Sequence, residues 1–227
     1  MPSLPKAVVA WSSGKDCAWA LHSVRSQGIS EVVGLLTTVT APFSRVSMHG
    51  VRTEILEAQA RALRLPVHSV PIPHPCPNEV YAAAMSRALT ELGHEGVTQI
   101  VFGDLFLEDV RTYRERQLKD TGFSPLFPLW GRPTRGLAEE MIEAGVKATV
   151  VCVDPRRLGV EWAGRTLDRR FLDELPPGVD PCGERGEFHT CVTAGPMFDR
   201  PLRVRPGPVV ERDGFVFADL ELASDPF

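Results

Sequence analysis

A run of small and charged residues near the start of the chain has the composition of a phosphate-binding loop. Its members are Ser12, Ser13, Gly14, Lys15, Asp16 and Cys17. The apolar segment 7–11 precedes it, as expected of a strand buried on both faces of a parallel sheet, and a predicted helix over 16–27 follows. Small residues let the backbone approach a phosphate, and the free amides of a helix N-terminus attract an anion. Since Lys15 adds a positive charge, the pattern predicts a nucleotide site.

Two widespread phosphate-binding motifs are absent from this loop. The Walker motif needs a glycine where Val9 stands, and Ser or Thr after the lysine, where Asp16 stands. The dinucleotide fingerprint needs several glycines, and this loop has only Gly14. The structural alternative is a helix-capping turn with a solvated lysine.

Several separate motifs resemble one enzyme superfamily. Ser-x-Gly-Lys-Asp after the first strand is similar to the pyrophosphate loop of the N-type ATP pyrophosphatases, whose relatives include the synthetases of GMP, NAD and asparagine. Residues 180–192 resemble the Gly-Glu-x-Gly-Glu-(Tyr/Phe)-x-Thr element of the diphthine–ammonia ligase family. Further landmarks of that family are matched at 47–49, 103–104 and 127–131. The resemblance covers residues 8–198, most of the chain.

The resemblance implies an ATP-dependent, AMP-forming ligase. ATP would bind with Mg²⁺, a carboxylate or similar oxygen of a small-molecule or protein acceptor would attack the α-phosphorus, and ammonia would displace AMP. The residues expected to bind the nucleotide are Ser12, Ser13, Gly14, Lys15, Asp16, Cys17, His49, Gly103 and Asp104. Those expected to bind the acceptor are Glu184, Gly186, Glu187 and Thr190, and the expected catalytic residues are Lys15, Asp16, Glu184 and Glu187. Either Asp16 or Asp104 would help to hold Mg²⁺, which prefers oxygen ligands.

Two residues depart from the family pattern. Cys17 stands in place of the usual closing Ser, and because a thiol is a weaker hydrogen-bond donor than a hydroxyl, we expect weakened phosphate binding. Arg185 stands where a glycine is more typical, and together with His189 it suggests an acceptor other than diphthine. We also expect Lys15→Ala to weaken ATP binding with little loss of stability.

The sequence leaves other functions open. A non-catalytic ATP- or AMP-binding regulatory module is compatible with Cys17. The segment 180–192, which we call the Glu-rich element, favours an enzyme. A tRNA-modifying pyrophosphatase is disfavoured by the acidic charge balance and by the absence of an RNA-binding extension. Glu184 and Glu187 would otherwise form an exposed acidic turn, and His49 would otherwise be a surface residue.

Strand-like and helix-like segments alternate over the first 155 residues. Strands are predicted at 7–11, 31–39, 67–72, 99–102 and 148–153. This alternation is typical of a Rossmann-like α/β fold with a doubly wound, five-stranded parallel sheet. From residue 180 the chain is rich in Gly and Pro, with short strand-like segments at 188–192, 202–204 and 215–220. We therefore expect an ATP-binding domain over 1–155 and a smaller, mainly antiparallel lobe over 156–227.

The composition narrows the class of protein. With 227 residues, a net charge of −4 and 43% hydrophobic residues, the chain is typical of globular proteins and lacks the basic excess of nucleic-acid binders. Five cysteines without a C-x-x-C pair predict reduced thiols in a cytoplasmic protein. The sequence has no apolar run long enough for a membrane span. No glutaminase is recognised, so free ammonia or a partner would supply nitrogen, and a homodimer is left open.

Overall fold

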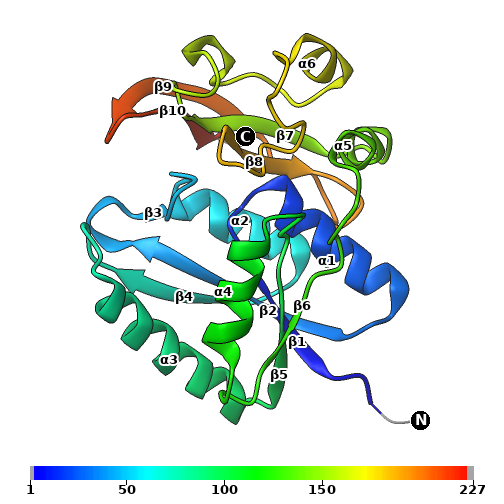
Figure 1. Cartoon of the computed structure of the whole chain (residues 1–227), viewed down its shortest axis with the longest axis vertical. Helices are drawn as coiled ribbons and strands as arrows, with labels where there is room; N and C mark the ends of the chain where they lie inside the picture. The colour runs from blue at the N-terminus through cyan, green and yellow to red at the C-terminus, as the bar shows by residue number, and fades with distance from the viewer. Residues whose placement is uncertain (1–2, 224–227) are drawn as a thin grey trace.

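The chain forms two β-sheets with helices around and between them (Figure 1). The computed structural model describes residues 3–223. The first sheet contains β1 (Lys6–Ala10), β2 (Glu31–Thr40), β3 (Arg45–Val46), β4 (Val67–Ile72), β5 (Val97–Val101) and β6 (Ser124–Leu126). The second contains β7 (Lys147–Val153), β8 (Phe188–Ala194), β9 (Val204–Arg212) and β10 (Phe215–Leu222).

Five strands of the first sheet are parallel, in the order β4-β2-β1-β5-β6, and β3 pairs antiparallel with the end of β2. Helices α1 (Lys15–Gln27) and α2 (Thr53–Leu63) pack on one face, and α3 (Asn78–His94) and α4 (Glu108–Leu118) lie on the other. Alternation along β1 serves both faces, since Ala7 and Val9 join one core and Val8 joins the other. The predicted doubly wound sheet is confirmed.

The strand order reverses between β1 and β5. The chain runs outward from β1 through β2 to β4, and then returns to place β5 on the other side of β1. In open α/β sheets ligands bind beyond the carboxyl ends of the strands at such a reversal. The segments that follow β1 and β5 therefore meet where a ligand is expected.

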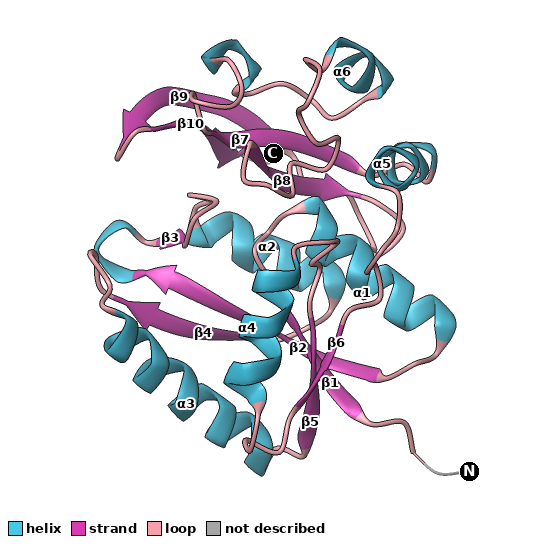
Figure 2. Ribbon diagram, in the orientation of Figure 1, coloured by secondary structure: helices cyan, strands magenta, loops and turns pink. Residues whose placement is uncertain are grey.

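The second sheet is antiparallel throughout, in the order β8-β7-β10-β9 (Figure 2). It is accompanied by α5 (Thr134–Glu143), α6 (Arg169–Glu174) and the short 3-10 turn η2 (Val160–Trp162), while a similar turn, η1 (Ala41–Phe43), follows β2. The expected mainly antiparallel C-terminal lobe is present. Helix α1 lies between the two sheets, and its Trp19 and Leu21 share one hydrophobic core with Val151 and Phe188.

One predicted strand belongs to a different sheet. The segment 148–153 was expected to complete the parallel sheet, but it forms β7 of the second sheet, and the fifth parallel strand is β6. A continuous apolar run indicates a strand buried on both faces without indicating its sheet, whereas the three residues of β6 include Pro125 and give no strand signal. A boundary at residue 155 would separate β7 from its partners. We therefore propose that the boundary lies between β6 and α5.

None of the helices between residues 3 and 223 combines the length and the apolar character that crossing a bilayer requires.

Candidate active site

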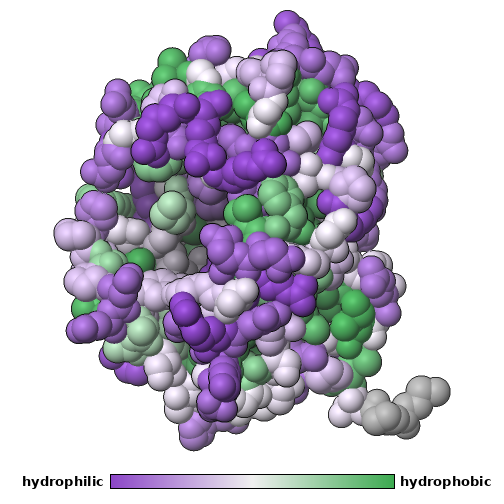
Figure 3. All heavy atoms as spheres, viewed as in Figure 1, coloured by the Kyte–Doolittle hydropathy of each residue, from purple (hydrophilic) through white to green (hydrophobic). Residues whose placement is uncertain are grey.

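A cavity of about 1410 Å³ opens between the carboxyl ends of the first sheet's strands and β8 of the second sheet. On the face shown in Figure 3 the surface is hollowed in this region, and hydrophilic side chains border the hollow. The predicted site residues that line the cavity are Ser12, Lys15, Asp16, Cys17, His49, Gly103, Asp104, Glu184 and Thr190. Ser13, Gly14, Gly186 and Glu187 are outside the lining.

The loop after β1 is tightly fitted to its surroundings through two glycines. A Cβ on Gly14 would lie 2.8 Å from Cε1 of His49, and a Cβ on Gly103 would lie 2.8 Å from backbone atoms of Asp16 and Cys17. A side chain at residue 103 would collide with backbone, so glycine is required there, whereas one at residue 14 would displace the His49 ring. The first turn of α1 consequently packs directly against the ends of β1 and β5.

Ser13 fixes the loop from behind the cavity. It adopts a left-handed conformation with φ 70°, and its carbonyl accepts hydrogen bonds from the Val192 amide and the Gln59 side chain. The loop is thereby joined to β8 and to α2. Cys17 also stabilises the loop, because its thiol donates a hydrogen bond to the Gly14 carbonyl at 3.1 Å. Burial raises the pKa of the Cys17 thiol, so it stays protonated.

Lys15 is buried, with 1% of its surface exposed, and its ammonium group bridges the two lobes. Nζ donates to the Cys182 carbonyl and, at 2.8 Å, to Oδ2 of Asp16. Its backbone amide donates to Oγ1 of Thr190 at 3.1 Å. Burial lowers the pKa of Lys15, but Asp16 and the other nearby acidic groups more than offset this effect, so the pKa is raised and the lysine stays charged.

Two aspartates, Asp16 and Asp104, line the cavity. Burial raises the pKa of both Asp16 and Asp104, and a neighbouring cation opposes the rise in each case: Lys15 for Asp16, and Arg114, at 3.7 Å, for Asp104. The Oδ1 atom of Asp16 is buried and has no hydrogen-bond partner within the described residues. A buried carboxylate oxygen without a partner is a good candidate for binding a ligand or a metal ion.

Across residues 3–223 no three His, Cys, Asp or Glu side chains are grouped as a ready metal site. Mg²⁺ does not require such a group, because it usually binds one or two carboxylates together with phosphate oxygens and water. The unpartnered Oδ1 of Asp16 fits that role better than Asp104, whose Oδ2 faces Arg114.

The Glu-rich element divides between the cavity and the interior. Glu184 lines the cavity and accepts a hydrogen bond from the Leu105 amide at 2.7 Å, across the gap between the lobes. Burial raises the pKa of Glu184 to about 7. Glu187 is buried behind the cavity, where Oε1 accepts the Asp180 amide at 3.0 Å. Gly186 lies between them with φ 83°, and this turn separates the two glutamates.

Two histidines, His49 of the first lobe and His189 of the second, contact each other beside the loop after β1. The rings of His49 and His189 have centroids 4.5 Å apart, and Nδ1 of His49 lies 3.0 Å from the Thr190 carbonyl. Burial lowers the pKa of both, that of His189 to about 4, and each is further lowered by a neighbouring positive charge. Both imidazoles are therefore neutral near pH 7.

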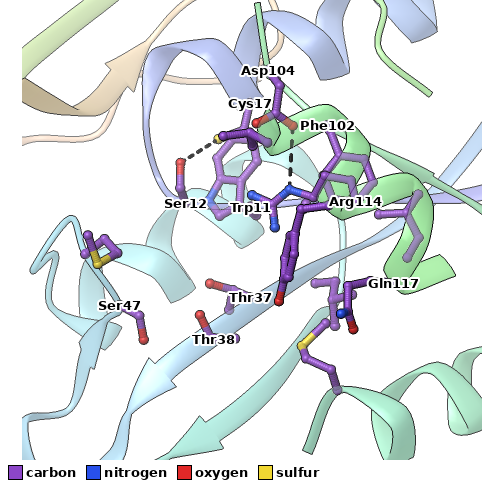
Figure 4. Close-up of a pocket in the computed structure, with 18 of the residues that line it drawn as sticks. Trp11, Ser12, Cys17, Thr37, Thr38, Ser47, Phe102, Asp104, Arg114 and Gln117 are labelled. Atoms are coloured by element: carbon purple, nitrogen blue, oxygen red, sulfur yellow. Dashed lines mark hydrogen bonds and ion pairs between the residues drawn. The ribbon is translucent and has the colours of Figure 1, made fainter. Parts of the chain in front are cut away.

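Several other residues face the cavity although no motif in the sequence predicted them as site residues (Figure 4). Thr37 and Thr38 lie near the carboxyl end of β2, and the buried Oγ1 of Thr37 has no partner among residues 3–223. Arg114 and Gln117 come from α4, and Arg114 stacks on the Phe102 ring with Cζ 5.0 Å from its centroid. A threonine pair at the carboxyl end of an otherwise apolar strand was the available signal.

Fold and cavity together define a class: a Rossmann-like α/β protein whose glycine-dependent loop opens into a cavity at the strand-order reversal. Comparison with family models is more specific. The model described as diphthamide synthase N-terminal domain matches residues 5–125, and the model described as diphthamide synthase C-terminal domain matches residues 133–218. The chain therefore belongs to the diphthamide synthase family.

Curated relatives agree with the family models. The chain is 32% identical over 129 residues to a protein named diphthine–ammonia ligase from Homo sapiens, 31% to that from Bos taurus and 30% to that from Mus musculus. Each match covers 55% of this chain and 48% of the relative. The chain thus spans about half the length of the curated relatives it matches.

Gly103→Ala should displace the loop after β1, although residue 103 lies outside that loop. The new methyl group would press on the backbone of Asp16 and Cys17, and we expect unfolding to become easier by about 1–3 kcal/mol, measured by urea denaturation. Gly136→Ala is the control, because nothing lies within 4 Å of its Cβ position, and in helix α5 the change should be neutral or stabilising. Equal stability of the two variants would contradict the close approach.

The position of Lys15 changes the expectation for Lys15→Ala. Because the side chain is buried and bonds to both Asp16 and the Cys182 carbonyl, its removal should lower the free energy of unfolding by about 2 kcal/mol or more, even without nucleotide. Lys147→Ala, on an exposed side chain, serves as the control in the same denaturation experiment. An unchanged unfolding midpoint for Lys15→Ala would contradict a stabilising role for these hydrogen bonds.

Proposed function

We propose that this protein is an ATP-dependent, AMP-forming ligase that activates an oxygen acceptor for amidation by ammonia. One observation carries the proposal: the loop after β1 and the Glu-rich element come from different lobes and line one cavity. A nucleotide phosphate site and an acceptor site must adjoin if the acceptor is to attack the α-phosphorus. Membership of a family whose relatives are named diphthine–ammonia ligase supports the same activity.

The nucleotide would bind with its phosphates against the start of α1. The first amides of the helix have no intrahelical partner, and the helix dipole adds a favourable field for an anion. Thr37 and Thr38 would offer hydroxyl groups to the rest of the nucleotide, since both face the same cavity. Lys15 would act mainly by holding the loop and its charge in place, because its Nζ is already bonded within the protein.

Asp16 is the proposed magnesium ligand through its unpartnered Oδ1. When bound, Mg²⁺ would stabilise the negative charge that collects on the departing pyrophosphate. Asp104 would remain with Arg114, and the pair would border the same charges.

The reaction would proceed in two displacements. An acceptor oxygen attacks the α-phosphorus, and the bond to the pyrophosphate oxygen breaks. Ammonia then attacks the activated carbon, AMP leaves, and one proton must be removed from nitrogen. Glu184 is the proposed base, because it lines the cavity and its pKa of about 7 suits proton transfer at neutral pH.

The acceptor itself is proposed only as a class. The relatives are named for diphthine, but this chain spans half their length and carries Arg185 and His189 within the acceptor element. A small molecule or a protein side chain with a free carboxylate would serve the mechanism. Nitrogen would come from free ammonia or a partner, and a homodimer remains compatible. The free thiols of all five cysteines suit a reducing, cytoplasmic setting.

A regulatory module that binds ATP or AMP without turnover is the second candidate. The buried ammonium of Lys15 favours it, since its hydrogen bonds to Asp16 and the Cys182 carbonyl restrain it from following a moving phosphate. The cavity position of Glu184 favours the enzyme, because a nucleotide sensor has no use for an acceptor site.

The activity can be tested with α-labelled ATP, Mg²⁺, ammonium and pooled cell metabolites, by separating labelled AMP from ADP. We expect AMP that depends on the metabolites, with an equal amount of pyrophosphate. Production of ADP would contradict the proposed bond cleavage. Tight ATP binding without either product would instead support the regulatory module.

The role of Glu184 predicts a pH dependence. Because a base must be ionised and burial raises the pKa of Glu184 to about 7, AMP release should rise as the pH increases through 7. Glu184→Gln should remove this limb and slow turnover by roughly 100-fold or more. Glu187→Gln is the matched control, since Glu187 lies outside the cavity and should alter stability rather than the pH profile. A normal profile in Glu184→Gln would exclude it as the base.

A further inference from the structure

A buried carboxylate of the second sheet holds the loop that carries Ser47 and His49. Asp219, in β10, is 8% exposed and lies far along the chain from that loop. Arg45 donates to it through Nη1 and Nη2 at 2.8 and 3.0 Å, and Arg52 donates through Nε and Nη2 at 3.0 and 2.6 Å. Four charge-assisted hydrogen bonds therefore converge on one carboxylate.

The two arginines flank the loop on both sides. Arg45 and Arg52 form a β-bridge with each other, and the Val46 amide bonds to the Val51 carbonyl at 2.8 Å. Arg45 also donates to the Gly50 carbonyl at 2.6 Å, so one guanidinium links Asp219 directly to the residue after His49. The segment 45–52 is thus a closed turn fastened at its base.

The tip of this turn has a left-handed backbone conformation at Met48 and Gly50. Met48 has φ 65°, a left-handed conformation that is costly for a side chain of this kind, and it is 68% exposed at the cavity edge. Gly50, with φ 68°, is pressed against the second sheet, where its Cβ would lie 2.7 Å from the Phe217 ring. Backbone strain of this kind persists only where the surroundings impose it.

Asp219 remains an anion under all ordinary conditions. Burial by itself would raise its pKa, but the hydrogen bonds and charges of Arg45 and Arg52 lower it to about 2. The ion pairs of Asp219 with Arg45 and Arg52 therefore do not change with pH near neutrality.

We propose that Asp219 is a positioning residue for the nucleotide site: by holding Arg45 and Arg52 it sets the turn that places His49 against the loop after β1 and Ser47 at the cavity wall. This inference rests on the proposed function, because it assumes that the cavity holds ATP. Asp219 itself is not among the residues that line the cavity and acts only through the turn. The second lobe thus contributes to nucleotide binding from a strand remote from the phosphates.

The test compares Asp219→Asn with Asp154→Asn. Asp154 is a matched control: it is also a buried carboxylate, directly after β7, and is held by two arginines, Arg156 and Arg157, but no contact joins it to the turn among the described residues. Calorimetric titration with ATP and Mg²⁺ should show roughly three- to tenfold weaker binding for Asp219→Asn and wild-type affinity for Asp154→Asn. Hydrogen exchange should quicken across residues 45–52 only in Asp219→Asn.

Arg45→Gln provides a second variant if Asp219→Asn fails to fold, because Arg52 still neutralises the buried carboxylate. It should reproduce the weaker ATP binding and the faster exchange. Wild-type affinity and exchange in the Asp219 and Arg45 variants, or equal losses in Asp154→Asn, would overturn the positioning role. Failure of the wild-type protein to bind ATP would instead overturn the proposed function, and the inference with it.

Discussion

The first turn of α1 is held by both lobes at once, and the site depends on this constraint. Lys15 bonds to the Cys182 carbonyl, the Lys15 amide bonds to Thr190, and the Ser13 carbonyl accepts from Val192. These three contacts join the loop after β1 to β8 and to the segment that precedes β8. Helix α1 contributes to a core shared by both sheets, so the lobes cannot separate without exposing it. The loop is therefore preorganised before any ligand binds.

This arrangement makes the second lobe part of the site rather than an appendage. Glu184 reaches the Leu105 amide of the first lobe, His189 stacks on His49, and Asp219 holds the turn that carries His49. Each contact joins segments more than 70 residues apart in the chain. A preorganised polar site stabilises developing charge without the cost of reorienting its dipoles during the reaction. Activation of an acceptor by ATP needs such a site, because most of its barrier concerns charge on phosphate oxygens.

The sequence predicted the parts of this site that have local signals. Small residues after an apolar strand identified the loop, and the family resemblance identified Gly103 and Asp104, which line the same cavity because parallel strands end at one edge of a sheet. Burial of Lys15 could not be predicted, since a loop lysine is normally solvated and only the approach of the second lobe encloses it. Glu187 was grouped with Glu184 by proximity in sequence, but the turn at Gly186 directs it inward. Strand β7 was assigned to the wrong sheet because its apolar pattern fits either one.

A crystal structure with a non-hydrolysable ATP analogue and Mn²⁺ would test directly whether the loop after β1 binds the phosphates. Anomalous scattering would locate the metal ion. The triphosphate should lie against the first amides of α1, the metal should bind Oδ1 of Asp16, and His49 and Glu184 should border the nucleotide. Lys15 should keep its bond to the Cys182 carbonyl. A nucleotide bound elsewhere in the cavity, such as between α3 and α4, or a metal held away from Asp16, would contradict this arrangement.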